Sequence, residues 1–215
     1  EAVNAEMRRE ALLLAADSYA EASGIATPVL PGLQPANTNT TRSLTENPGD
    51  RAFALYQRYA ATYPAPLEDA LEVRYKIALM LRDRNMPDGY LAELRRIIAA
   101  DAAGGDGRTD RTRHLAALSA LILAEPQFRQ LDEIKLVQPF EQNLQKKARA
   151  MKSAREAFEN LLNYEVGEVT AAATYYLAEM QYGFSRALTE SERPVDLDAE
   201  EMEQYELSIE EQAYP

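Results

Sequence analysis

The sequence predicts an all-α protein built from antiparallel helix pairs, and three observations support this class. A pattern of small and aromatic residues that suits paired helices occurs twice along the chain. Alanine is abundant, glycine accounts for only 9 of the 215 residues, and the alternation of Val, Ile and Thr typical of strands is missing. One apolar stripe also runs along a predicted helix of about 25 residues that follows Pro139.

The repeated pattern places a small residue one turn before an aromatic or large residue. The copies are Ala52-x3-Tyr56-x2-Tyr59 followed by Tyr75-x2-Ala78, and Ala154-x3-Phe158-x2-Leu161 followed by Tyr175-x2-Ala178. Alanine allows a neighbouring helix to approach closely, and the large side chain fills the space beside it. Each copy therefore predicts two consecutive packed helices.

The N-terminal region predicts one helix and one long connection. Residues 3–23 carry apolar side chains at helical spacing, so residues 1–23 are predicted to be an N-terminal helix. Residues 24–50 contain four prolines and a run of Asn and Thr, and are predicted to be a loop or an ordered crossover.

Three helices are predicted next. The first covers 51–63, with Asp50 as its N-cap and its end at Pro64. The second covers 67–84. The third covers 89–102 with Asp88 as its cap, and the glycine-rich segment 103–107 breaks it.

The second half begins with a helix that starts at Asp110 and is predicted to end before Pro126. Residues 126–137 have a mixed pattern that predicts no element. The long stripe then follows, formed by Phe140, Leu144, Ala148, Met151, Ala154, Phe158 and Leu161.

An antiparallel neighbour is predicted from Glu168 to Leu188, and a loop from Ser191 to Asp198. The acidic region 189–215 ends in a predicted helix, Ala199–Ala213, with its inward side chains at Met202, Tyr205 and Ile209. The apolar face of this helix extends to the last residues of the sequence, so we expect the protein to continue beyond Pro215.

Charge and composition exclude several classes of partner. The net charge is −12. Residues 189–215 hold ten acidic residues and one basic residue, Arg193, so this segment accounts for nine of the twelve excess negative charges. An acidic chain repels phosphate backbones, so nucleic acid is not expected as a partner. The longest apolar run, Leu115–Ala124, is shorter than the roughly 18 residues of a membrane helix, so no direct membrane insertion is expected.

Candidate catalytic and metal-ligating residues are few. The chain has no cysteine, and its one histidine, His114, lies between Arg113 and Leu115, where nearby positive charge disfavours a base or a metal ligand. Glu200, Glu203 and Glu210 lie near one side of the last predicted helix but belong to no calcium-binding loop. We therefore expect no catalytic site, no cofactor and no metal.

The one basic cluster has two interpretations. It could receive an acidic segment of a partner, or it could pair with neighbouring acids of the same chain, which we favour. The cluster consists of Arg95, Arg96, Arg108, Arg111 and Arg113, and the neighbouring acids are Asp101, Asp106 and Asp110.

The repeated pattern resembles the tetratricopeptide repeat, a helix pair whose second helix carries Ala, an aromatic, a small residue and then Pro. The matching positions are Ala52, Tyr56 and Pro64 in the first copy, and Ala154 and Phe158 in the second. The departures are Tyr59, Leu161 and Val166, and the absence of Trp. The resemblance implies a short α-solenoid across 51–188 and a role in binding other proteins.

Two stretches are also similar to long repeat proteins of Gram-negative cell envelopes, some associated with gliding motility or with Ton/Tol-like complexes. They are Arg108–Arg113 and Glu203–Pro215. This similarity implies a periplasmic or cell-envelope location, the alternative being the cytoplasm.

The functional prediction is a non-catalytic scaffold that binds a peptide or helix of a partner protein. In the repeat family, the first helix of each pair faces the groove, which implies five contact residues: Tyr75, Lys76, Arg82, Tyr175 and Tyr182. Two alternatives stay open, namely a helical accessory domain of a larger enzyme, such as one that cleaves the cell wall, and a self-assembling structural protein.

Overall fold

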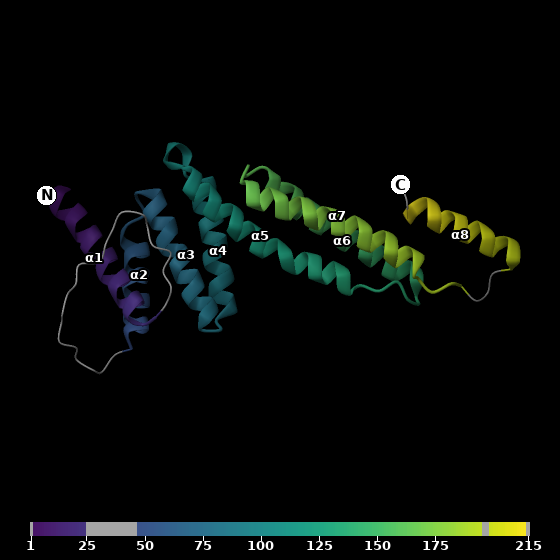
Figure 1. Ribbon diagram of the computed structural model, residues 1–215, viewed down its shortest axis with the longest axis horizontal. Coiled ribbons are helices and arrows are strands. Elements are labelled where there is room, and N and C mark those ends of the chain that lie inside the picture. The colour runs from purple at the N-terminus through teal and green to yellow at the C-terminus, as the bar shows by residue number, and fades with distance from the viewer. Residues whose placement is uncertain (1, 25–46, 195–197, 214–215) are drawn as a thin grey trace. The chain divides into compact units, whose positions relative to one another are not determined.

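The computed structural model describes residues 2–24, 47–194 and 198–213 (Figure 1). Within these residues it contains eight α-helices, one short 3-10 turn and no strand. Helices that are neighbours in sequence pack against each other, which confirms the all-α class. Most of the predicted loop at 24–50 lies outside the described residues.

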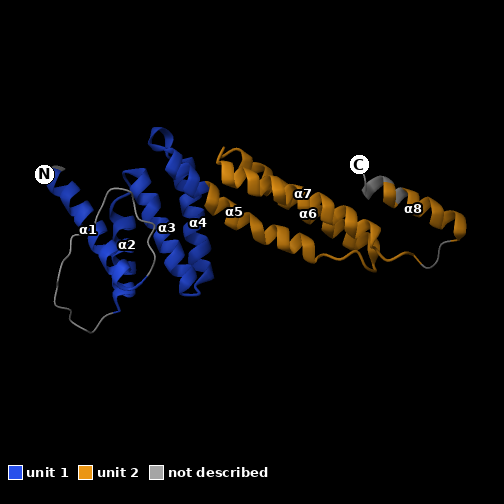
Figure 2. Ribbon diagram, viewed as in Figure 1, with its two compact units in different colours: residues 1–116 blue, residues 117–215 orange. Residues whose placement is uncertain are grey.

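The chain divides into two compact units, Glu1–Ala116 and Ala117–Pro215 (Figure 2). The boundary falls inside one helix, α5, which spans Asp110–Glu133. Each unit has a hydrophobic core of its own, so each is described by itself.

The first unit begins with the pair α1, Ala2–Ala22, and α2, Pro48–Thr62, which lie side by side (Figure 1). Small residues of α1 and aromatic residues of α2 lie in one shared core, whereas the repeated pattern predicts the packing of α2 with the following helix, α3, which is also in contact with it. The fully or almost fully buried residues at this contact are Ala16, Ala20, Ala52, Tyr56 and Tyr59.

Two predicted helix caps are wrong. Helix α2 begins at Pro48, and Asn47 is its N-cap, accepting a 3.0 Å hydrogen bond from the Gly49 amide. Helix α4, Pro87–Ala102, follows Met86. In both cases a proline occupies the start of the helix, where its fixed φ is favourable and its missing N–H costs nothing. The expected caps, Asp50 and Asp88, therefore lie in the first turns.

Helix α3, Leu67–Asp83, pairs with α4 through a connection that contains Asn85 in the left-handed region at φ 55°. A short 3-10 turn, Gly105–Gly107, then connects α4 to α5. Gly104 precedes this turn, and a Cβ there would lie only 2.4 Å from Leu67 Cδ2. A side chain at this position would therefore force Leu67 or the turn itself to shift.

Helix α5 does not end before Pro126 as predicted, but continues through it to Glu133. A proline inside a helix removes one backbone hydrogen bond and crowds the preceding turn. The residues that follow include Leu131, which is only 3% exposed and belongs to the same core as Phe158 and Met180. Burial of this turn offsets the local penalty.

The second unit is completed by α6, Phe140–Leu162, and its antiparallel neighbour α7, Gly167–Thr189. The predicted stripe on α6 is confirmed at Ala154, Phe158 and Leu161, which are buried, but Ala148 is exposed and Lys147 is buried beside it. Helix α8, Ala199–Ala213, has the predicted bounds, and Ile209 lies in a small core with Leu136 and Leu188.

Candidate protein-binding surface

Helix α7 has two faces of opposite character. Its inward face carries Val169, Ala173, Met180 and Leu188, each at most 2% exposed. On the opposite side, Tyr175 is 61% exposed and Tyr182 is 63% exposed. These two large aromatic side chains lie on the same side of one helix and are mostly exposed to solvent. Such an exposed pair makes this face a candidate contact surface.

Two alanines complete the exposed face. Ala171, Tyr175, Ala178 and Tyr182 follow one another at intervals of four, three and four residues, and all are exposed. We call these four residues the tyrosine stripe. Intervals of three and four keep side chains on one side of a helix, so small and large residues alternate along a single line.

The adjacent Tyr176 is packed into the core, and its ring also meets the ring of the exposed Tyr175 with centroids 5.7 Å apart. Its ring packs 4.8 Å from that of Phe158 and 5.0 Å from that of Phe128, and its hydroxyl donates to Glu125 at 3.3 Å. Burial, followed by the charge of Glu125, raises the pKa of Tyr176. Tyr176 is therefore a core residue, although it is one position away from Tyr175.

The ends of the stripe carry opposite charges. Glu168 lies in the first turn of α7 and Arg186 in its last turn, and both are exposed. The Arg186 guanidinium also lies over the Tyr182 ring, 5.8 Å from its centroid. This cation–π contact holds one side of the ring and leaves the rest open to a partner.

The five predicted contact residues are divided between the two units. Tyr175 and Tyr182 belong to the second unit and are exposed. Tyr75, Lys76 and Arg82 belong to α3 in the first unit, where Tyr75 is half-buried and Arg82 is exposed with its guanidinium bonded to the adjacent Asp83 at 3.1 Å.

Lys76 is not available as a surface contact, because its side chain is only 5% exposed. Its Nζ donates to Asp17 at 2.6 Å and lies 5.4 Å from the centroid of the Tyr56 ring. The Tyr56 hydroxyl donates to the same Asp17 oxygen at 2.5 Å. Burial, and then Asp17, raise the pKa of Tyr56. These three residues connect α1, α2 and α3, so Lys76 has a structural role.

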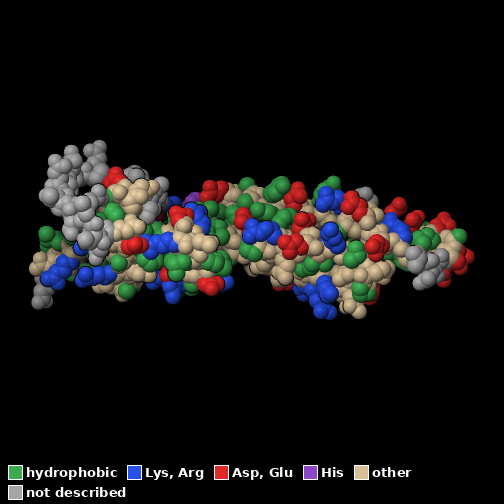
Figure 3. Space-filling view, turned by 90° about the horizontal axis from the view of Figure 1, so that it is seen from below, with side chains coloured by type: hydrophobic (Ala, Val, Ile, Leu, Met, Phe, Trp, Pro, Cys, Tyr) green, Lys and Arg blue, Asp and Glu red, His purple; other side chains and the backbone are tan. Residues whose placement is uncertain are grey.

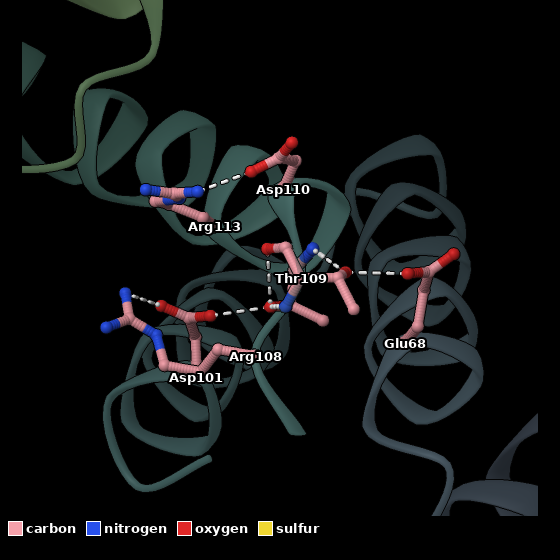
Figure 4. A network of polar contacts seen from close by, with 7 residues as sticks. Glu68, Asp101, Arg108, Thr109, Asp110 and Arg113 are labelled. Atoms are coloured by element: carbon pink, nitrogen blue, oxygen red, sulfur yellow. Dashed lines mark hydrogen bonds and ion pairs between the residues drawn. The ribbon is translucent and has the colours of Figure 1, made fainter. Parts of the chain in front are cut away.

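The basic cluster is largely paired with acids of its own chain, which agrees with the interpretation that we favoured. Arg108 bonds Asp101 at 2.8 Å, Arg113 bonds Asp110, and both pairs lie around the start of α5 (Figure 4). The other pairs are Arg96 with Glu93 and Arg111 with Glu72.

Asp101 is the centre of this network and is only 1% exposed. Its second oxygen accepts a 2.8 Å hydrogen bond from the Thr112 hydroxyl, and Thr109 of the same turn bonds Glu68 of α3 at 2.6 Å (Figure 4). A buried carboxylate with two partners fixes the α4–α5 connection. On the face shown in Figure 3, basic and acidic side chains are interspersed, as this pairing implies.

Lys147 is the buried cation of the second unit. Its Nζ donates to the carbonyl oxygens of Leu131 at 3.0 Å and Ile134 at 2.8 Å, where α5 ends. The last carbonyls of a helix lack partners within the helix and attract cations. Burial lowers the pKa of Lys147, with a smaller opposing effect from Asp132. Its contacts are those of a helix cap.

Two further searches of the described residues bear on the predicted partners. No group of three or more His, Asp or Glu side chains there is placed to hold a metal ion. None of the helices in these ranges combines the length and apolar character needed to cross a bilayer.

Comparison of the chain with protein-family models, curated proteins and solved structures finds no match. The tetratricopeptide-like resemblance therefore stays a prediction, and the argument for function rests on the geometry of the chain itself.

Proposed function

We propose that this protein is a non-catalytic scaffold that binds a helix of a partner protein along the tyrosine stripe of α7. The observation that carries the proposal is the exposure of Tyr175 and Tyr182, 61% and 63%, on the face opposite the buried one. Tyrosine combines apolar area with a hydroxyl group and loses little conformational entropy when it is covered, so it is common at the energetic centre of interfaces.

The alternation of small and large residues favours a helical partner. The two alanines allow a partner backbone to come close, and the two tyrosines alternate with them along the stripe and project toward the partner. The stripe residues are spaced by four, three and four residues. A helix that packs along α7 has side chains at the same spacing and can contact all four of them. An extended peptide has a two-residue side-chain period and matches this spacing poorly.

A binding role is also supported by the polar contacts inside the protein, which engage the less exposed charged side chains in structural roles. Asp17 and Lys76 bond each other, Asp101 bonds Arg108, and Lys147 caps α5. Lys76, Asp101 and Lys147 are buried, and their charges are thus engaged in contacts that hold the fold together, which is the use expected in a scaffold.

The packing of neighbouring helices is compatible with a repeat-like arrangement. In the repeat family that the sequence resembles, α3 and α7 correspond to the first helices of two repeats. Stacking of these pairs as a tetratricopeptide-like solenoid, and a location in the bacterial envelope, are parts of the proposal that rest on the sequence resemblance.

The proposal is tested by capturing partners from the envelope fraction of the source organism with three forms of the chain. These are the wild type, the double variant Tyr175→Ala/Tyr182→Ala, and the control Leu207→Ala, which removes a side chain of α8 that is 56% exposed. A captured protein is then purified and its affinity for each form is measured by calorimetry.

A partner that binds the wild type and the control equally, and the double variant at least about tenfold more weakly, supports the proposal. Equal binding by all three forms contradicts it, and so does the absence of any captured partner when the chain also shows no association with itself through the stripe. Circular dichroism of the double variant must show unchanged helicity, because loss of structure would mean that the tyrosines are core residues.

A further inference from the structure

The tyrosine stripe is complementary to itself when two copies run antiparallel. Its centre lies midway between Tyr175 and Ala178 in the sequence. Rotation of a second α7 about that point places Tyr175 against the second copy's Ala178, and Tyr182 against the second copy's Ala171. Every large side chain then meets a small one, which is the condition for close helix packing.

The charges follow the same symmetry. The antiparallel arrangement brings Glu168 of one copy next to Arg186 of the other, at both ends of the contact. In a parallel arrangement, Glu168 would meet Glu168 of the second copy and Arg186 would meet Arg186. Each tyrosine would also meet a tyrosine. Steric fit and charge thus favour the antiparallel arrangement.

The net charge of the chain does not prevent this contact. Helix α7 carries only Glu168, Glu179 and Arg186 as charged residues, and nine of the twelve excess negative charges lie in residues 189–215. The repulsion between the acidic segments is screened by salt beyond about 8–10 Å. Higher ionic strength therefore reduces this repulsion, while it also weakens the two exposed Glu168–Arg186 contacts.

We propose that the helix bound by the tyrosine stripe is α7 of a second copy of this chain, in an antiparallel symmetric dimer. This inference rests on the proposed function, because it requires the stripe to bind a helix. Four tyrosines contribute roughly 500 Å² of buried surface, and flanking residues about as much again. A contact of about 1,000 Å² lies at the lower end of specific interfaces, so the dimer is weak, with a dissociation constant of tens of micromolar or so.

The absence of cysteine from the chain allows a direct test of the geometry. Two single-cysteine proteins, Ala171→Cys and Tyr182→Cys, are mixed and oxidised. In the antiparallel dimer these two positions face each other within disulfide reach. Two copies of the same position lie about 16 Å apart along the helix axis, because the two positions are separated by eleven residues. The mixed dimer keeps three of its four tyrosines.

The expected result is a disulfide dimer from the mixture and little from either protein alone. A Leu207→Cys protein mixed with Ala171→Cys gives the background from random collision, since Leu207 is exposed on α8. Cross-linking of each single variant with itself, or cross-linking of the mixture at the background level, overturns the inference.

Sedimentation equilibrium without cross-linking provides the second measurement. The wild type is expected to change from monomer to dimer between low micromolar and near-millimolar concentration. Ala178→Glu, which puts two negative charges at the centre of the contact, is expected to raise the dissociation constant by about tenfold or more. A wild type that stays monomeric overturns the inference. If a different protein is then captured through the stripe, the proposed function stands and only the dimer is ruled out. If no protein is captured, both the dimer and the proposed function are ruled out.

Discussion

The two units of this protein hold their helices together by different means. In the first unit, charged and polar side chains bridge helices, as in Asp17 with Tyr56 and Lys76, or Asp101 of α4 with Thr112 of α5. In the second unit, the central contacts are aromatic, with Phe158 and Phe128 packed on Tyr176.

The difference suggests two roles: polar contacts in the first unit determine which helices pack together, and the second unit exposes one face of a helix. Buried ion pairs add little net stability, but they penalise every arrangement that leaves one partner alone. The first unit thereby fixes which helices are neighbours. In the second unit, one face of α7 is buried in the core shared with α5 and α6, and the opposite face, with Tyr175 and Tyr182, is exposed. In our proposal this exposed face binds the partner.

The largest effect is expected in the aromatic core of the second unit. Phe158→Ala removes a fully buried ring, and should lower the free energy of unfolding by about 3–5 kcal/mol. Urea unfolding measures the loss, and hydrogen exchange should show faster exchange in residues 117–194 than in residues 48–116. Equal acceleration in both segments would mean that the units do not unfold separately.

A smaller effect is expected at the polar connection of the first unit. Gly104→Ala puts a Cβ 2.4 Å from Leu67 Cδ2 and 3.1 Å from the Asp101 carbonyl oxygen, so it should cost about 1–3 kcal/mol through strain. Gly107→Ala is the matched control, since its Cβ would lie 3.8 Å from Leu67 Cβ, an ordinary contact. Thermal unfolding that shows equal losses for both variants contradicts this explanation.

Removing one hydroxyl should have a still smaller effect. Tyr56→Phe deletes the hydrogen bond to Asp17 and should cost about 1 kcal/mol at neutral pH. Because the pKa of Tyr56 is raised in the folded protein, the unfolded chain loses this proton first as the pH passes 10.0. The contribution of the hydroxyl is complete below that pH and decreases above it.

Unfolding of the wild type and Tyr56→Phe across this pH range measures that decrease. A difference that stays constant above pH 10.0 would show that the hydroxyl ionises equally in the folded and unfolded chains.

The smallest effect on stability is expected at the tyrosine stripe itself. Tyr175→Ala and Tyr182→Ala should each change the free energy of unfolding by less than about 0.5 kcal/mol, because these side chains are already mostly exposed. Urea unfolding at a concentration below dimer formation checks this. A loss similar to that of Phe158→Ala would show that the stripe belongs to the core.

The sequence was sufficient to predict the helices and the centre of each core, because apolar side chains at three- and four-residue spacing identify a buried face. Tyr56 and Phe158 are buried where the repeated pattern predicts. The continuation of α5 through Pro126 was not predictable in this way, since the local penalty of proline is offset by burial of Leu131 in a core formed with later helices.

The candidate site was only partly predictable. Tyr175 and Tyr182 were identified as contact residues, and they are exposed, but Lys76 was chosen although it bonds Asp17 on a helix far away in the sequence. Spacing within one helix does not reveal such a partner. Ala171 and Ala178 were missed as site residues, although their spacing from the two tyrosines was visible in the sequence.

The central claim is that Tyr175 and Tyr182 bind a partner helix without stabilising the fold. The most direct test is sedimentation equilibrium of the wild type and of Tyr175→Ala/Tyr182→Ala, with urea unfolding of the same samples. We predict that the wild type associates, that the double variant stays monomeric, and that the unfolding of the monomer is unchanged. Equal association by both proteins, or loss of association together with loss of stability, would contradict the account.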